Sequence, residues 1–272
     1  FDPREQYSRL DDGSLDPREF TIDRYNHRFG KAALEDYALF YNMGYDLENG
    51  FNVYSFGSYS EREGNSGGFY RRAKDSRNVL ELYPNGFLPQ IATDVKDYSL
   101  ALGLQGDSGD WTWDVSTNYG RNDFGLGVVN SLNTSLGTNS QTEFDNGAMV
   151  YDQFLVNFDA NTSVDFGLPD DVFFTIGAEY RRESYKIEQG EEASYITALD
   201  NNGNPIAAGG AQVLPGFGPQ SATNESRHNV AVFAEFDTYL TDKWNVVLAS
   251  RYEDYSDFGN TFTSKLATRY SI

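Results

Sequence analysis

The feature that most constrains the fold is an alternation of residue character that recurs in stretches of about ten residues. From Tyr37 to Leu47 every second residue is tyrosine, leucine or methionine, and the residues between them include Asn42, Gly44 and Asp46. Successive side chains of a β-strand point to opposite faces. The stretch therefore predicts a strand with one apolar face.

The same alternation returns along the whole chain and predicts an all-β protein. Asn49-Gly50 lies between the first two stretches and is a strong signal for a tight hairpin turn. The region 1–33 is polar and irregular, with Asp-Pro-Arg-Glu at both 2–5 and 16–19, and we expect a loop or connection there. We predict nine strands, at about residues 35–47, 51–62, 98–104, 111–120, 150–160, 172–187, 227–239, 243–255 and 262–272.

The connections between these strands alternate between short and long. The long ones are 63–95, 122–149 and 188–225, and strict alternation places all three at one end of the sheet. Loops longer than about 12–15 residues are uncommon inside compact domains, whereas transmembrane β-barrels have short periplasmic turns and long extracellular loops. Strands of ten residues also suit a tilted membrane strand, which needs about 9–11 residues. The pattern favours an antiparallel transmembrane β-barrel segment over a half-exposed soluble sheet.

Composition excludes several classes of function. The chain has 272 residues with 41 acidic and 21 basic side chains, a formal charge of -20, so we expect no nucleic-acid partner. It has no cysteine and only His27 and His228, which leaves little for a thiolate or histidine metal site or a catalytic triad. We expect no enzymatic activity, no cofactor and no metal. Because the chain starts at Phe1 and stops at Ile272 within a strand-like stretch, we expect a piece of a longer protein.

The candidate ligand-binding residues lie in the long loops. Phe69, Tyr70, Arg71 and Arg72 place two aromatic rings beside two guanidinium groups, a combination that can hold an anionic or sugar-like ligand. The alternative is a loop held together by local ion pairs. Side-chain amides in the second long loop could hydrogen-bond a polar ligand, and the candidates there are Asn130 and Asn133.

Several segments resemble the barrel of TonB-dependent outer-membrane receptors. The main one is the run RYEDYSDFG at 251–259, followed by Lys265 and Arg269-Tyr270. Four further segments point the same way: GFYRR at 68–72, YPNGFLP at 83–89, NSLNTSLG at 130–137 and GAEYRRE at 177–183. Individually these motifs are weak, and their order along a β-rich chain carries the resemblance.

The resemblance implies a fold and a function. The family's barrel has 22 strands around an N-terminal plug domain, so residues 1–272 would be a middle section of a single barrel domain, without the plug and the C-terminal strands. The implied location is the outer membrane of a Gram-negative bacterium. The implied function is uptake of a scarce solute such as a siderophore, cobalamin or an oligosaccharide, with membrane lipid, the plug and the TonB complex as partners. A passive porin and a soluble β-sandwich that binds carbohydrate or acts as an adhesin are the alternatives.

Overall fold

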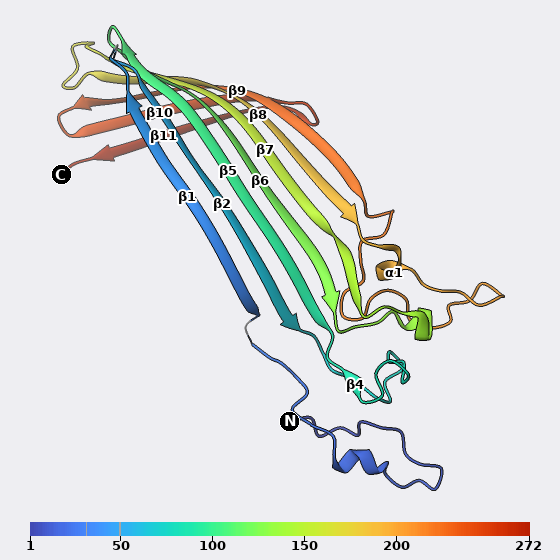
Figure 1. Ribbon diagram of the computed structural model, residues 1–272. Coiled ribbons are helices and arrows are strands. Elements are labelled where there is room, and N and C mark those ends of the chain that lie inside the picture. The colour runs from blue at the N-terminus through green and yellow to red at the C-terminus, as the bar shows by residue number, and fades with distance from the viewer. Residues whose placement is uncertain (31, 49) are drawn as a thin grey trace.

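In the computed structural model, which describes residues 1–30, 32–48 and 50–272, nine strands form one antiparallel sheet. Each strand pairs with the next long strand along the chain, so the sheet is a continuous meander with β1 and β11 at its open edges (Figure 1). The strands are β1 (Ala33–Asp46), β2 (Asn52–Gly67), β5 (Gln90–Ser108), β6 (Trp111–Val129), β7 (Glu143–Val164), β8 (Val172–Gln189), β9 (Thr223–Thr241), β10 (Trp244–Tyr255) and β11 (Gly259–Tyr270).

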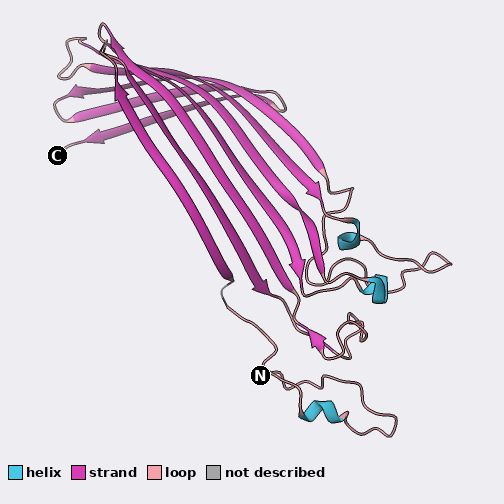
Figure 2. Cartoon of the chain, viewed as in Figure 1, coloured by secondary structure: helices cyan, strands magenta, loops and turns pink. Residues whose placement is uncertain are grey.

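The remaining elements are short and lie in the connections. Figure 2 shows them gathered at the end of the sheet where the long loops are. Among the described residues, no helix has the length and apolar character needed to cross a membrane. These elements are the two-stranded sheet of β3 (Arg71–Arg72) and β4 (Gly86–Phe87), the 3-10 helices η1 (Pro17–Phe20) and η2 (Thr134–Asn139), and the one-turn helix α1 (Glu192–Tyr195).

The all-β antiparallel prediction is confirmed, and so is the placement of the three long connections at one end. The predicted strand ends are wrong on that side, because β5, β6 and β7 continue far into the regions 63–95 and 122–149 that were expected to be loop. The true loops are 68–89, 130–142 and 190–222. The predicted turn residue Asn49 lies outside the described residues; around it, the Leu47 amide donates to the Phe51 carbonyl at 2.7 Å.

One face of the sheet carries a continuous apolar band. Register places Leu39 of β1, Leu102 of β5, Val156 of β7 and Leu248 of β10 on this face, and all four side chains are exposed. Within the described residues no second sheet packs against the band. We call this face the outward face and its reverse the inward face.

Aromatic rings border the band on both sides. Near the loop end the border on the outward face consists of Tyr37, Tyr59, Tyr98, Tyr119, Tyr180 and Tyr252. Between neighbouring hairpins the position of the tyrosine along the strand shifts by two residues. Near the short turns the outward face carries Tyr45, Trp111, Trp113, Phe174, Phe236, Trp244 and Tyr270. The two borders lie eight residues apart on β1, β6 and β10. The strands therefore extend well past the Tyr border at the loop end.

The inward face is hydrophilic and closely fitted. The Tyr54 ring lies over Gly103, where an added Cβ would come within 2.0 Å of the ring, and the Tyr54 hydroxyl donates to Asp114 at 3.0 Å. The Phe233 ring covers Gly177 in the same way. Glycine is required at these two positions because the backbone and an aromatic ring approach each other closely.

Candidate functional site

The long loops and the first thirty residues pack into one body at the loop end of the sheet. Its small apolar core contains Val128 of β6, Phe144 of β7 and Ala211 of the loop 190–222. Buried polar groups hold the second and third long loops together: the Ser131 hydroxyl donates to the Gln212 carbonyl at 2.8 Å, and the Gln212 amide donates to the Leu132 carbonyl at 3.0 Å. We call this body the loop cap.

The segment 1–30 joins the loop 68–89 through four contacts. The Tyr7 hydroxyl donates to the Asn85 side chain at 2.8 Å, and Arg72 donates to the Glu5 carbonyl at 3.0 Å. Lys74 forms an ion pair with the Glu5 carboxylate at 3.0 Å, and its amide donates to the Gln6 carbonyl at 3.0 Å. These contacts fix the two segments side by side.

Two hollows open at this joint, and both are lined by Tyr7 and Arg18. The Arg18 guanidinium lies 4.1 Å from the centre of the Tyr7 ring, so a cation–π pair separates the hollows. One has a volume of about 510 Å³ and the other about 560 Å³. The first is also lined by Tyr70, Asn26 and Asn85, which offer a ring and amide groups to a polar ligand.

The structure brings one of the predicted residues to a hollow. Tyr70 lines the first hollow, its hydroxyl donates to the Asn85 carbonyl at 2.7 Å, and burial raises its pKa to about 12. Phe69 is exposed beside it, as are Phe29 and Tyr25 of the first segment. Sequence reasoning missed Tyr7 and Arg18, because the region 1–33 carries no strand pattern and was treated only as a connection.

Arg71 and Arg72 differ from the other two cations of the loop 68–89. Arg71 is buried, and it donates to the Phe69 carbonyl at 2.7 Å and weakly to Gln212 at 3.4 Å. Burial lowers the pKa of Arg71. Within the described residues no carboxylate oxygen lies within 4.0 Å of Arg71 or Arg72, although the nearby Lys74 and Arg77 both have acidic partners. The local ion pairs of the alternative interpretation are therefore made by Lys74 and Arg77.

The predicted amide residues have different environments. Asn130 is exposed at a positive φ of 52° and donates to the Leu88 carbonyl at 2.8 Å. Asn133 is fully buried: its side-chain nitrogen donates to the Ala193 and Ile196 carbonyls, both at 2.9 Å, and its oxygen accepts from the amide and hydroxyl of Ser135. All of its hydrogen-bonding groups are used to hold the loop cap together.

The joint contains three copies of one local arrangement, an aspartate that accepts hydrogen bonds from the arginine two residues later, which we call the clasp. In Asp2-Pro3-Arg4 the aspartate accepts from the Arg4 amide at 3.1 Å and from its guanidinium at 2.8 Å. The same geometry recurs in 16–18 and 75–77, and the Arg partners lower the pKa of all three aspartates. The repeat at 2–5 and 16–19 was the visible signal for two of these clasps.

Charge is distributed unevenly between the joint and the rest of the chain. The segments 1–30 and 68–89 together hold nine basic and nine acidic residues, which leaves twelve basic and thirty-two acidic residues elsewhere. The joint is therefore neutral within a strongly acidic chain. An anionic solute meets less repulsion there than over other surfaces.

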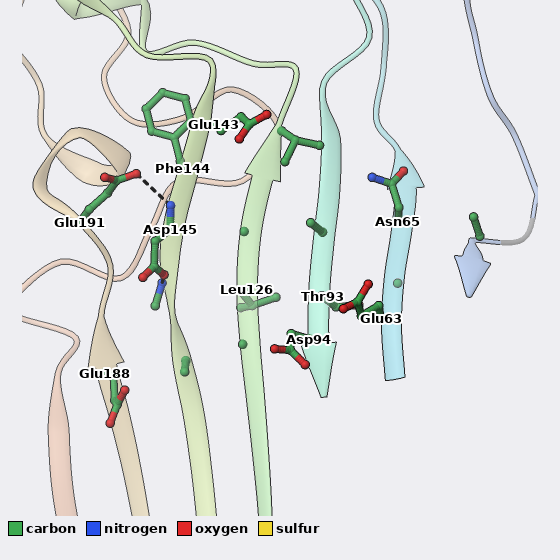
Figure 3. Close-up of a pocket in the computed structure, with 18 of the residues that line it drawn as sticks. Glu63, Asn65, Thr93, Asp94, Leu126, Glu143, Phe144, Asp145, Glu188 and Glu191 are labelled. Atoms are coloured by element: carbon green, nitrogen blue, oxygen red, sulfur yellow. Dashed lines mark hydrogen bonds between the residues drawn. The ribbon is translucent and has the colours of Figure 1, made fainter. Parts of the chain in front are cut away.

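A further hollow, of about 990 Å³, is a different kind of surface. Figure 3 shows carboxylates around it, including Glu63, Asp94, Glu143 and Glu188, and the Asp145 amide donating to Glu191 at 2.9 Å. Register places Glu63, Asp94 and Glu188 on the outward face, beyond the Tyr border. In the described ranges, no group of three or more acidic or histidine side chains has the arrangement to hold a metal ion.

Comparisons with known proteins agree with this architecture. The chain resembles the siderophore receptor PirA from Acinetobacter baumannii, with a TM-score of 0.59, 16% identity, and coverage of 89% of this chain and 32% of that one. It also resembles a mutant form of the ferric enterobactin receptor PfeA from Pseudomonas aeruginosa, with a TM-score of 0.56, 10% identity, and coverage of 92% and 32%. The chain thus spans about a third of either receptor.

The search of curated protein sequences found no match. The family described as TonB dependent receptor-like, beta-barrel matches residues 10–272, nearly the whole chain. The sheet order, the loop cap and this match agree with one another. The chain belongs to the TonB-dependent receptor-like β-barrel family.

Proposed function

We propose that this chain is part of the barrel wall of an outer-membrane receptor that imports a scarce solute with energy delivered through TonB. The observation that carries the proposal is the continuous apolar band on the outward face, backed by a hydrophilic inward face. In water such a band would be a large exposed apolar patch, which soluble proteins rarely carry. In a bilayer it meets hydrocarbon.

The dimensions of the band fit a bilayer. The aromatic borders enclose nine residues on β1, β6 and β10, and a tilted membrane strand needs about 9–11. Tyr and Trp concentrate at both membrane interfaces because their rings are apolar and their polar groups face water. The Tyr border then lies at the outer interface and the Trp-rich border at the periplasmic one. The loop cap faces the cell exterior.

We further propose an anionic iron chelate as the solute. The two similar structures are named as a siderophore receptor and a ferric enterobactin receptor, and the joint offers features that suit such a ligand. Arg71 and Arg72 lack carboxylate partners among the described residues, and Tyr70 and Phe69 add aromatic surface beside them. A buried cation without a counter-charge is costly, so an anionic ligand at Arg71 would gain binding energy. Cobalamin and neutral oligosaccharides lack the charge that this site favours.

Uptake of iron chelates by cells that carry the full-length receptor tests the proposed function. Cells that depend on it are given ⁵⁵Fe as ferric enterobactin, as a hydroxamate chelate and as a citrate chelate, with and without a proton uncoupler. We expect uptake of at least one chelate, and we expect the uncoupler or deletion of TonB to abolish it. Uptake that continues without the proton gradient would identify a passive porin instead.

Paired substitutions test the site. Arg71→Ala with Arg72→Ala should weaken binding of the transported chelate by at least tenfold, whereas Lys186→Ala, which removes an exposed cation of β8 outside the joint, should leave it unchanged. Because Arg71 is buried, a second variant with Arg71→Lys and Arg72→Lys is compared with the double alanine variant. It keeps both positive charges and should retain part of the affinity for the chelate. Unchanged affinity in the double alanine variant would remove these two residues from the site.

A further inference from the structure

In the described part of the chain, two residues other than glycine have a left-handed backbone conformation: Asn130 at a φ of 52° and Val213 at a φ of 85°. Asparagine adopts this conformation fairly often, whereas for a β-branched residue such as valine it is strained. Such strain persists only where the surrounding structure fixes it, and it is frequent at ligand-binding sites. The conformation of Val213 therefore needs a cause in its surroundings.

The residues on either side of Val213 are tied to other parts of the loop cap. Before it, the Gln212 carbonyl accepts from the Ser131 hydroxyl at 2.8 Å. After it, the Leu214 carbonyl accepts from the side-chain amide of Asn146. The Val213 side chain also packs against the small apolar core of the loop cap. The backbone thus enters and leaves this residue at fixed points, which hold it in the strained conformation.

The Val213 side chain lies directly on Gly68. An added Cβ at Gly68 would come within 2.5 Å of a Val213 methyl carbon. Gly68 begins the first long loop, and its amide donates at 2.8 Å to the carbonyl of Pro89, which ends that loop. Beside this contact the Asn130 side chain donates to the Leu88 carbonyl at 2.8 Å. We call Gly68 and Pro89 the loop base; the second long loop holds it through Asn130 and the third through Val213.

The first long loop is itself well ordered between its base and the two arginines. β3 and β4 pair Arg71 with Phe87 and Arg72 with Gly86. The buried Phe87 ring stacks on the Tyr83 ring, with 4.5 Å between the ring centres. This small sheet begins a few residues from the loop base on either side, so a shift of the base would move both guanidinium groups.

We propose that Val213 is a positioning residue for the solute site: it fixes the loop base and thereby keeps Arg71 and Arg72 where an anionic solute meets them. The inference rests on the proposed function, and Val213 acts through the loop, without contact to the solute. A loop already held in its binding conformation loses less free energy to ordering when the ligand binds. If the loop had this conformation only about a tenth of the time, the apparent affinity would fall about tenfold.

An exchange of side-chain size between two residues of the full-length receptor tests this assignment. Gly68→Ala places a methyl group against Val213, and Val213→Ala removes the methyl groups that it meets. The probe is ⁵⁵Fe as ferric enterobactin, or as the hydroxamate or citrate chelate where that is the one transported. We expect each single variant to bind the probe about tenfold more weakly, and the double variant to recover to within about threefold of the unsubstituted receptor.

Ile206→Ala is the matched control, because it shortens an exposed aliphatic side chain in the same loop as Val213 and should leave the affinity unchanged. A double variant that binds no better than the weaker single variant would overturn the assignment. If Gly68→Ala does not reach the outer membrane, Val213→Thr takes its place. It keeps a branched side chain and should bind within about threefold of the unsubstituted receptor. Equal losses of affinity in Val213→Thr and Val213→Ala would then overturn the assignment.

Amide hydrogen exchange gives a readout that does not depend on any solute. The amide of residue 68 donates to the Pro89 carbonyl, so its exchange in the detergent-solubilised receptor reports opening of the loop base. Exchange should accelerate about tenfold in Val213→Ala and return to the original rate in the double variant. Faster exchange with unchanged chelate affinity would overturn the positioning role, and so would unchanged exchange. If no chelate binds at all, the proposed function fails, and the exchange rates still decide whether Val213 holds the loop base.

Discussion

Asn133→Ala should open the loop cap locally without disturbing the strands. The side chain makes four buried hydrogen bonds, two to carbonyls of the loop 190–222 and two from Ser135. Each such bond contributes about 1 kcal/mol net, so their loss costs about 4 kcal/mol. At about 1.4 kcal/mol per factor of ten, local opening becomes ~10³-fold more frequent. Truncation also leaves the Ala193 and Ile196 carbonyls without these partners.

Amide hydrogen exchange in the detergent-solubilised receptor measures this opening. The reporter is the Gln212 amide, which donates to the Leu132 carbonyl at 3.0 Å across the same loop contact. Its exchange should accelerate ~10³-fold, while amides in the membrane part of β6 keep their rates. The control is Asn130→Gly, because glycine tolerates the positive φ at this exposed residue and only one hydrogen bond is lost. An acceleration of less than tenfold in Asn133→Ala would refute the reasoning.

Three further predictions concern the wall and the joint. Gly103→Ala should destabilise the barrel by about 1–3 kcal/mol, seen as a lower unfolding temperature, because the new methyl group displaces the Tyr54 ring. Phe158→Arg should reduce assembled receptor in the outer membrane, because this residue lies opposite Val115, midway between the two borders, and a cation at mid-bilayer on the lipid face costs about 2–4 kcal/mol. The clasp of Asp75 with Arg77 should persist from neutral pH down to the ordinary aspartate pKa of about 3.9 and open only below it, because the Arg77 partner lowers the pKa of Asp75 and the stability is lost as pH falls through this lowered pKa. Proteolysis of the loop 68–89 as a function of pH measures the opening.

Each of these has a matched control. Gly120→Ala adds the same methyl group in open space and should leave the unfolding temperature unchanged. Asn157→Arg places the cation on the adjacent inward position, opposite Glu179, and should assemble normally. Asp75→Asn should make the loop equally susceptible at pH 7 and pH 3. Stability of Gly103→Ala equal to that of the unsubstituted receptor would contradict the close ring contact.

The sequence was sufficient to predict the sheet wherever one face carries the apolar band. Alternation of apolar and polar residues there reflects a physical contrast between the two sides, so residues of the stretch 37–47 such as Leu39 and Tyr41 were assigned to the apolar face correctly. Past the Tyr border both faces carry polar and charged residues, and the contrast disappears. The region 122–129 reads as polar and glycine-rich, yet it continues β6, because the ladder of backbone hydrogen bonds does not depend on side-chain polarity.

The candidate site was predictable only in part. Arg71 stood out because two adjacent cations are unusual in so acidic a chain, and Tyr70 followed from its neighbourhood. Asn133 illustrates the limit: an asparagine in a polar loop has the same composition signal whether it faces a ligand or caps a buried turn. Tyr7 and Arg18 join Tyr70 through contacts between segments more than fifty residues apart. Such contacts depend on tertiary packing, which local pattern does not encode.

The uneven placement of the indole side chains has a practical consequence. Trp111, Trp113 and Trp244 are the only tryptophans of the chain, and all three border the short turns. Tryptophan fluorescence from this chain, excited at the long-wavelength edge of its ultraviolet absorption band, should therefore report on a single leaflet of the membrane. Brominated lipids introduced into that leaflet should quench the emission, while quenchers confined to the opposite monolayer should not. The three indoles therefore mark the short-turn side of the part of the wall that this chain forms.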